Sequence, residues 1–404
     1  MVNSLYPPHG FGGPELYSRR LSEELVRRGH CVAATYNETL YSYKQRRWKT
    51  EPRDSISRIM EGVRIYPLTS GMGFVDLYKT YLAGYSGSLS AGLDSVRKLT
   101  SPDVVHFQNI SVFGWNILRH AGNARTVFTA HDFWSFCQRE DFTFFGRYQC
   151  SGPSAARCFA CGMGSAGDMR PPQLWRWSSA FKEAMDSVDT LTAFSEYATG
   201  VLRRTLRRKV IHLPGFVPHP PILSGPNEVG KRYFLFIGIL RENKGILRLL
   251  EAMESIRPQT NVNLLVAGEG PLKERLKLFI DKNALGDRVT LLGWVDESMK
   301  YRLMRNAEAL VVPSTWPENA PGVALEALSV GLPIIGSDSP GLSEIVQKVD
   351  RNLVYSNSDS NALREVLLGY DRSKYHPDDI RRIFEQHYSP ERHLSRYLDL
   401  VNSI

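Results

Sequence analysis

The sequence predicts an α/β protein made of two doubly wound domains that face a cleft. The chain has 404 residues, which is more than one hydrophobic core usually organises. Short β-branched runs alternate with helical periods along both halves, as in proteins built on parallel sheets. A segment dense in Pro and Gly, residues 215–231, lies between the halves and is interpreted as a linker.

The expected domains span residues 1–214 and 232–388, and residues 389–404 contain a last helix. In the first domain the predicted strands are Val104 to Phe107, Thr126 to Ala130, Thr190 to Phe194 and Lys209 to Leu213. In the second domain they are Tyr233 to Gly238, Asn263 to Gly268, Val289 to Gly293, Ala309 to Val312 and Pro333 to Gly336.

The chain opens with only about three strand residues, V-N-S, before a glycine-rich turn and a helix that begins near Glu15. A central strand of that length is marginal. We therefore expect either a first strand reduced to a stub or a true start that lies upstream.

Two carboxylates stand at either end of a turn-to-helix unit in the second domain. Glu318 lies in a loop after a buried strand, and Glu326 lies in a helix expected from about Pro321 to Val330, with Gly331 at its C′ position. That helix is apolar on nearly every side, so Glu326 needs hydrogen-bond donors or a positive partner. Ribose hydroxyls would serve; the alternatives are a structural Lys or Arg for Glu326 and solvent for Glu318.

This unit resembles the signature of retaining, sugar-nucleotide-dependent glycosyltransferases of family four, which have the GT-B fold of two Rossmann-like domains. The family pattern Glu-x7-Glu stands here as Glu318 to Glu326, followed by A-L-S-V-G-L-P-I-I-G. The resemblance covers essentially the whole chain and is weakest across residues 37–100. It implies a hexosyl transfer from UDP-, GDP- or ADP-sugar to an acceptor hydroxyl with an α linkage, in cell-surface polysaccharide or glycan biosynthesis.

The resemblance also implies donor-binding residues. It assigns Glu318 to the sugar hydroxyls, Glu326 to the ribose and Lys244 to the diphosphate, whose negative charge grows during transfer. Ile239 stands where the family has an arginine, and Arg241 is the candidate replacement two positions later. Glycines that allow close approach of the backbone to the donor complete the set: Gly12, Gly13, Gly268, Gly322 and Gly341.

Two histidines end predicted strands of the first domain, where ligands of open parallel sheets collect. His131 matches the family's H-D, which implies a catalytic position near the transferred sugar beside Glu318 and Lys244. Asp132 is expected to orient the imidazole or to bind the acceptor, and His106 is also assigned to the acceptor side. A packing role is the alternative for a lone histidine, and no nucleophile is assigned.

Four of the five cysteines fall in an insertion at residues 137–161, as Cys137, Cys150, Cys158 and Cys161. Four thiolates with one C-x2-C pair can hold a structural zinc ion. Reduced, packed thiols and a disulfide are the alternatives, and a cytosolic location disfavours the disulfide. Cys31 is expected in the core, and catalysis is expected to need no cofactor.

Composition bears on partners and location. No run approaches 18 apolar residues and no signal-peptide pattern is present, so we expect a cytoplasmic protein. The net charge of +8 is concentrated at Lys44 to Lys49 and Arg203 to Lys209. With the Trp and Arg residues of Pro171 to Trp177, these clusters favour peripheral contact with the anionic inner face of the membrane, and solvated surface is the alternative.

The expected partners are the sugar nucleotide and a glycan, lipid-linked or small-molecule acceptor, with no nucleic acid. The rival hypothesis is a non-catalytic GT-B relic that serves as a binding module for nucleic acid or a partner enzyme. Ile239 and the short first strand favour that hypothesis slightly. Retention of both glutamates, Lys244 and His131 opposes it.

Overall fold

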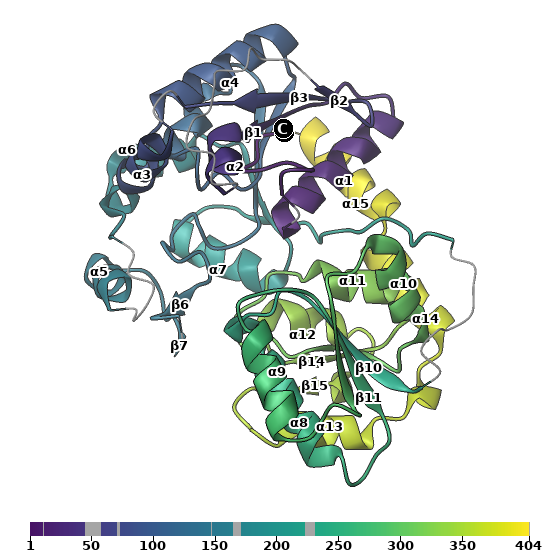
Figure 1. Ribbon diagram of the computed structural model, residues 1–404. Helices are drawn as coiled ribbons and strands as arrows, with labels where there is room; N and C mark the ends of the chain where they lie inside the picture. The colour runs from purple at the N-terminus through teal and green to yellow at the C-terminus, as the bar shows by residue number, and fades with distance from the viewer. Residues whose placement is uncertain are drawn as a thin grey trace. The chain divides into compact units, whose positions relative to one another are not determined.

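The computed structural model describes residues 1–10, 12–44, 58–70, 73–146, 148–164, 171–222 and 231–403. They form two compact units, one of Met1–Leu213 with Leu394–Ile404 and one of Pro214–His393 (Figure 1). Part of the predicted linker, residues 223–230, and most of the first basic cluster, residues 45–49, lie outside the described residues.

The second unit contains a six-stranded parallel sheet with the strand order β12-β11-β10-β13-β14-β15. The order reverses direction between β10 and β13, as in a doubly wound fold. The strands are β10 (Tyr233–Ile237), β11 (Asn263–Ala267), β12 (Val289–Gly293), β13 (Leu310–Val312), β14 (Ile334–Ser337) and β15 (Val354–Tyr355).

Helices cover both faces of this sheet. Figure 1 shows α8, α9 and α13 on one side of the strands and α10, α11 and α14 on the other, and α8 packs on α13 as α11 packs on α14. The helices are α8 (Ile246–Ile256), α9 (Lys273–Lys282), α10 (Glu297–Asn306), α11 (Gly322–Ser329), α12 (Pro340–Val346), α13 (Ala362–Gly369) and α14 (Pro377–His387), with short 3₁₀ turns η3 (Glu242–Lys244), η4 (Arg351–Leu353) and η5 (Arg372–Lys374).

The first unit also has a sheet whose strand order reverses near its centre. The residues Met1–Ser4 join two groups of strands there. Val2 bridges Thr35 of one group and Phe107 of the other, in parallel with both. One group is β1 (Ala33–Asn37), β3 (Val63–Leu68) and β2 (Arg58–Met60); the other is β4 (Val104–Phe107), β5 (Arg125–Ala130), β8 (Thr190–Ala193) and β9 (Ile211–His212).

The opening residues therefore occupy the centre of this sheet. The amide of Val2 donates to His106 O at 2.9 Å, and the amide of Asn3 donates to Thr35 O at 3.1 Å. The segment is as short as expected from the sequence, yet it is hydrogen-bonded on both edges. The loop that follows this segment and leads into α1 therefore lies at the point where the strand order reverses.

The helices of the first unit are α1 (Gly13–Arg27), α2 (Glu38–Lys44), α3 (Phe74–Ala83), α4 (Gly87–Thr100), α5 (Ala155–Met163), α6 (Ser179–Asp186), α7 (Glu196–Leu206) and most of α15 (Pro390–Asn402), with 3₁₀ turns η1 (Trp115–His120) and η2 (Leu174–Trp177). Helix α15 begins in the second unit and packs on the first from Leu394 onward. Arg125 Nη1 donates to Val401 O at 2.7 Å, which anchors the end of α15.

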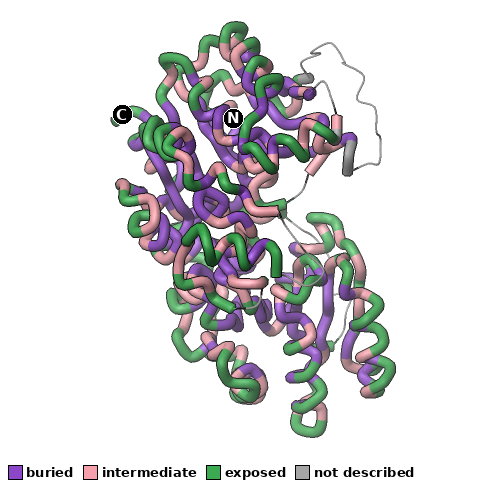
Figure 2. Tube along the Cα trace, turned by 90° about the vertical axis from the view of Figure 1, so that its left-hand side faces the viewer, coloured by how far each residue is buried: buried purple, intermediate pink, exposed green. Residues whose placement is uncertain are grey.

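The buried residues follow the strands, while exposed residues lie on the outer surfaces of the helices (Figure 2). The predicted α/β class with parallel sheets is confirmed. The sequence did not predict β1, β2 and β3, of which β2 and β3 lie in the region of weakest resemblance, or the short hairpin of β6 (Thr143–Phe144) and β7 (Tyr148–Gln149). The prediction that Cys31 is a core residue is wrong, because Cys31 is exposed.

Among the described residues, no helix has both the length and the apolar character that crossing a membrane requires.

Candidate functional site

In the second unit, two loops meet where the strand order reverses. One follows β10 and carries Lys244; the other follows β13 and carries Glu318. Ligands of doubly wound sheets bind outside the carboxyl ends of the strands at such a point. The Nζ atom of Lys244 lies 2.7 Å from Glu318 Oε1, so two residues 74 positions apart in the chain form one ion pair.

Glu318 is buried and its carboxylate is fully hydrogen-bonded at one oxygen. Its Oε1 accepts from Lys244 Nζ, from Ser314 Oγ at 2.6 Å and from Trp316 Nε1 at 2.8 Å. Burial alone would raise the pKa of Glu318, but the charge of Lys244 and these three hydrogen bonds outweigh it and lower the pKa. Glu318 is therefore an anion at pH 7, and the solvated-loop alternative is wrong.

Trp316 also orients the cation. Lys244 Nζ lies 4.8 Å from the centre of the Trp316 ring, within cation–π distance. Neither Trp316 nor Ser314 was singled out in the sequence, although both lie within four residues before Glu318. Their polar hydrogens point at the carboxylate, a role that spacing alone does not reveal.

The loop of Glu318 is braced by the start of α12. Glu318 N donates to Ser339 Oγ at 2.9 Å, and Gly341 N donates to Glu318 O at 3.1 Å. A Cβ atom at position 341 would overlap the carbonyl oxygens of Glu318 and Asn319. Gly341 thus has a packing reason within the unit, independent of the predicted diphosphate contact.

Glu326 has a protein partner. Its Oε1 lies 2.9 Å from Nζ of Lys300, a residue of α10, and both side chains are largely buried. This is the structural lysine that the sequence left open as an alternative to ribose. Nothing in the sequence pattern singled out Lys300, because α10 joins α11 only through the tertiary fold.

The remaining donor candidates lie at the same carboxyl edge. Arg241 and Ile239 are both exposed on the loop after β10. Gly268 follows β11 with φ +145°, and a Cβ there would overlap Gly238 O, so backbone packing requires this glycine. A Cβ at Gly322 would meet nothing within 4 Å, which leaves the first turn of α11 open to a ligand.

In the first unit, the glycine-rich turn and His131 lie beside one another. Gly12 is the N-cap residue of α1 and Gly13 is the first residue of this helix. A Cβ atom at position 13 would meet nothing within 4 Å. Tyr17 of α1 presents its ring edge to His131, with 5.3 Å between ring centres, and Phe194 does the same at 5.0 Å. The turn after Ser4 and the end of β5 therefore converge at the carboxyl edge of this sheet.

His131 is held as a neutral imidazole. Its Nε2 lies 2.6 Å from Gln108 Oε1. Burial lowers its pKa from 6.5 to about 3, so the ring carries no charge at pH 7. Because the amide oxygen of Gln108 can only accept, Nε2 carries the proton and Nδ1 keeps a lone pair.

Asp132 lies in a second polar cluster. Its Oδ1 accepts from Trp134 N at 2.8 Å. Burial, reinforced by the nearby Glu140, raises the pKa of Asp132 well above its usual range. Arg176, which was predicted as a membrane-contacting residue, is instead buried and stacks on Trp175, with 4.4 Å between its guanidinium carbon and the ring centre.

His106 is buried and bonded on both sides. Its Nδ1 lies 3.0 Å from Tyr397 OH and its Nε2 lies 2.7 Å from Thr129 Oγ1. The predicted acceptor-side residue is thus part of the interior of the first unit. Tyr397, Gln108 and Thr129 were not identified from the sequence.

The four cysteines of the insertion share one small substructure. Cys150 follows β7, and Cys158 and Cys161 lie one turn apart on α5. Phe145 N donates to Cys161 Sγ at 3.2 Å, and Gln138 Nε2 donates to Cys158 O at 2.7 Å, which ties the turn of Cys137 to α5. Burial raises the pKa of the Cys137 thiol to about 12.

None of the five cysteines forms a disulfide bond, so the disulfide alternative is wrong. Within the described ranges, the only group with three metal-ligating atoms mutually within 4.8 Å is exposed: His219, Glu385 and Glu391. The imidazole of His219 faces the two glutamates with different nitrogens, Nδ1 toward Glu385 and Nε2 toward Glu391. The sulfur atoms of the insertion are not gathered in this way, and zinc there remains a prediction.

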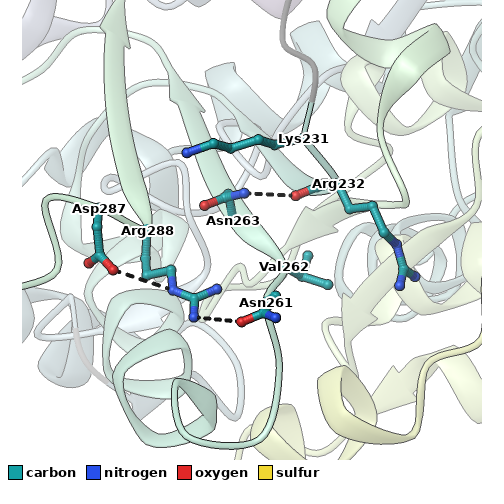
Figure 3. A pocket seen from close by; sticks show the side chains of 7 residues that line it. All are labelled: Lys231, Arg232, Asn261, Val262, Asn263, Asp287 and Arg288. Carbon is teal, nitrogen blue, oxygen red and sulfur yellow. Dashed lines mark hydrogen bonds and ion pairs between the residues drawn. The ribbon is translucent and has the colours of Figure 1, made fainter.

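A depression of about 460 Å³ lies at the opposite edge of the second unit's sheet (Figure 3). It is lined at the amino ends of β10, β11 and β12, where Arg288 bonds to Asn261 at 3.0 Å and Arg232 pairs with Glu308. Arg288 also lies 3.6 Å from Asp287, so two of the three cations that line the depression have a carboxylate partner. It is not part of the candidate site.

Comparisons with known proteins match both units of the chain to glycosyltransferase families. The profile of "Glycosyltransferase Family 4" matches residues 11–218, and that of "Glycosyl transferases group 1" matches residues 224–370. A D-rhamnosyltransferase of Pseudomonas aeruginosa is 34% identical over 35% of this chain and 36% of its own length. An O-antigen chain mannosyltransferase of Escherichia coli is 28% identical over 44% of this chain and 48% of its own length. The chain thus spans less than half the length of these two relatives.

Solved structures share the fold. Sucrose-phosphate synthase from Thermosynechococcus elongatus superimposes with a TM-score of 0.70 at 20% identity, covering 100% of this chain and 98% of the other. The Anabaena protein HepE, in complex with UDP and glucose, superimposes with a TM-score of 0.64 at 14% identity, also over 100% and 98% of the two chains.

The lowered pKa of His131 predicts a pH dependence of stability. Between about pH 6.5 and 3 the unfolded chain binds a proton at residue 131 that the native protein does not, so stability falls as the pH drops through this window. The slope for one proton is about 1.4 kcal/mol per pH unit. The free energy of unfolding of wild type and of His131→Gln can be measured by urea titration at a series of pH values. The difference between the two proteins should change with pH below 6.5 and should be constant above it. A pH-independent difference would contradict a neutral native imidazole.

Removal of metal tests the zinc prediction. If the four thiols bind zinc, the purified protein should release one zinc ion per chain on denaturation, and chelation should lower Tm. Cys158→Ser should abolish both effects, and Cys31→Ser, which changes an exposed thiol, should alter neither. Absence of metal together with alkylation of all five thiols under denaturing conditions would establish the packed-thiol alternative instead.

Proposed function

Because this chain belongs to glycosyltransferase family 4 and has the GT-B fold, we propose that it transfers a sugar from a nucleoside-diphosphate sugar to an acceptor hydroxyl. The configuration at the anomeric carbon is retained, so the product has an α linkage. The transfer needs no metal ion, because a lysine supplies the positive charge.

The observation that carries the proposal is the Lys244–Glu318 pair at the reversal point of the second unit's sheet. A departing diphosphate gains negative charge, and an ammonium group in a partly buried site stabilises it electrostatically. Glu318 holds the ammonium group of Lys244 in place before the donor binds. Its carboxylate can also accept hydrogen bonds from sugar hydroxyls, as the resemblance implies.

The second carboxylate acts on the nucleoside. Glu326 accepts hydrogen bonds from the ribose in this proposal, while Lys300 stabilises it as an anion. The first turn of α11, which begins at Gly322, supplies free N–H groups for phosphate oxygens. Arg241, exposed near Lys244, is the second candidate cation.

His131 acts near the anomeric centre. As a neutral imidazole it stabilises the positive sugar through its lone pair without adding a competing charge. Burial raises the pKa of Asp132, which favours the protonated carboxyl that would donate a hydrogen bond to the acceptor.

The nucleotide is UDP, GDP or ADP, and the acceptor is a glycan, a lipid-linked glycan or a small molecule. Support comes from the names of similar proteins: HepE was solved with UDP and glucose, and the relatives include an O-antigen mannosyltransferase and an amylovoran biosynthesis glycosyltransferase of Erwinia amylovora. These names favour a role in polysaccharide or glycan biosynthesis.

Donor binding is the first test of the proposal. A thermal-shift panel of UDP-, GDP-, ADP- and dTDP-sugars should raise Tm with one nucleotide class only, because a ligand that binds the native state alone stabilises it. No shift with any donor, combined with salt-dependent retention of nucleic acid, would support the binding-module hypothesis instead.

Kinetics of two variants test the site. Lys244→Ala should lower kcat by roughly 100-fold with a small change in donor KM, because the lysine acts on charge that develops in the transition state. Glu326→Gln, which preserves shape, should raise donor KM by about tenfold through loss of one charged hydrogen bond. Lys277→Ala is a matched control, since Lys277 pairs with Glu274 on the surface of α9. Unchanged kinetics in both site variants would show that the assignment is wrong.

We also propose peripheral contact with an anionic membrane through one surface of the first unit. Helix α3 and η2 pack together there, and they expose the apolar side chains Tyr78, Leu82, Leu174 and Trp177. Trp175 turns inward, where its Nε1 donates to Tyr81 O at 3.1 Å. Of the Trp and Arg residues of that pattern, Trp177 therefore lies on the contact surface, whereas Trp175 and Arg176 do not.

Liposome co-sedimentation tests this contact. Wild type should bind vesicles that contain anionic lipid more than purely zwitterionic ones, and the double variant Leu174→Ser, Trp177→Ser should bind less because apolar insertion is lost. Leu278→Ser removes an equally exposed leucine from α9 of the second unit and should have no effect. Equal binding by wild type and the double variant would contradict the proposal.

A further inference from the structure

A buried chain of hydrogen bonds leads from helix α15 to His131. Tyr397 OH lies 3.0 Å from His106 Nδ1, His106 Nε2 lies 3.0 Å from Gln108 Nε2, and Gln108 Oε1 lies 2.6 Å from His131 Nε2. The four side chains come from α15, β4, the residue just after β4, and the residue just after β5. Residues 291 positions apart in the chain thus share one network.

The network has a defined direction. Gln108 offers its oxygen to His131 and its NH₂ group to His106, so His131 Nε2 is a donor and His106 Nε2 is an acceptor. A neutral His106 then carries its proton on Nδ1 and donates it to Tyr397 OH. The hydroxyl of Thr129 lies 2.7 Å from His106 Nε2 and is able to act as a second donor to the same nitrogen.

Burial makes each link costly to break. His106 and Gln108 are each 1% exposed, and Tyr397 is 3% exposed. In such surroundings a donor or acceptor that loses its partner cannot form a hydrogen bond to water instead. The hydrogen bonds of the network therefore depend on one another. Stacking reinforces the first link, because the rings of His106 and Tyr397 lie 5.4 Å apart at an interplanar angle of 17°.

We propose that Tyr397, His106 and Gln108 are positioning residues that hold His131 as its Nε2–H tautomer. The Nδ1 lone pair of His131 is thereby kept for the reaction, and the aromatic rings of Tyr17 and Phe194 fix the plane of the imidazole. The catalytic meaning of this tautomer rests on the proposed glycosyl transfer; the tautomer itself does not.

The arrangement gives α15 a role beyond packing. Because α15 begins at Pro390 in the second unit and supplies Tyr397 to the first, the position of this helix sets the far end of the network. Arg396, the residue before Tyr397, donates to His212 O at 2.7 Å and fixes the register of the helix at this point.

The tautomer can be read directly by NMR. In protein labelled with ¹⁵N in the histidine rings, the His131 signals, assigned by their loss in His131→Gln, should show protonated Nε2 and unprotonated Nδ1 at pH 7. The opposite tautomer would overturn the proposal without any functional assay. In Gln108→Leu the His131 signals should shift toward a mixture of both tautomers.

Tyr397→Phe tests the far end of the network. This variant removes only the hydroxyl, and it should shift the His131 ring signals and lower kcat by roughly tenfold, the usual scale for residues that orient a reacting group. Donor KM should stay within about twofold, because the donor site of the second unit is untouched. Tyr36→Phe is the matched control: it removes the hydroxyl of another buried tyrosine of the first unit, bonded to Glu38 at 2.6 Å.

The possible outcomes separate the two proposals. If Tyr397→Phe and Tyr36→Phe lose the same stability and activity and neither shifts the His131 signals, Tyr397 is only a packing residue and the inference fails. If the tautomer is as expected but no donor binds wild type, the network stands and the proposed glycosyl transfer fails. Should Tyr397→Phe not fold, the wild-type tautomer and the Gln108→Leu spectrum still decide the inference.

Discussion

The ion pair between Lys244 and Glu318 can form only because β10 and β13 are neighbours in a sheet whose strands all run the same way. In such a sheet, the loops after both strands leave at one edge, and the reversal of strand order between them keeps their helices apart on opposite faces. Two residues separated by 74 positions are thereby brought to 2.7 Å. The surrounding hydroxyl, indole and backbone groups then serve one purpose, to keep a buried carboxylate ionised beside its lysine.

The first unit repeats the plan with a different interior. Its central strand is the short segment Met1–Ser4, hydrogen-bonded to neighbours on both edges. At its carboxyl edge burial lowers the pKa of His131 to about 3 and raises the pKa of Asp132, while His106 is hydrogen-bonded within the network that reaches Tyr397. The second unit thus holds a buried ion pair at its reversal point, and the first holds an imidazole whose burial favours the neutral form.

Several residues singled out from the sequence have two physical explanations. Gly341 and Gly268 are required by close backbone packing, whether or not a ligand also approaches them, and Glu326 is paired with Lys300, whether or not a ribose also binds it. His106 ends a strand like a ligand-binding residue, yet both its nitrogens are engaged inside the unit. A motif identifies the position, but the competing demands on that position become visible only when its neighbours are known.

The sequence by itself determined the α/β class, most strands from β4 onward and the bounds of α11 to within a residue, because β-branched runs, helix caps and Gly or Pro stops act over short distances. It did not predict β1 to β3, whose mixed composition lacks a clear period, or the exposure of Cys31. The partners of the site residues, among them Lys300, Gln108, Arg176 and Tyr397, were decided by tertiary structure alone. Those contacts join elements far apart in the chain, and no local pattern records which side chain will fill the remaining hydrogen bond of a buried polar group.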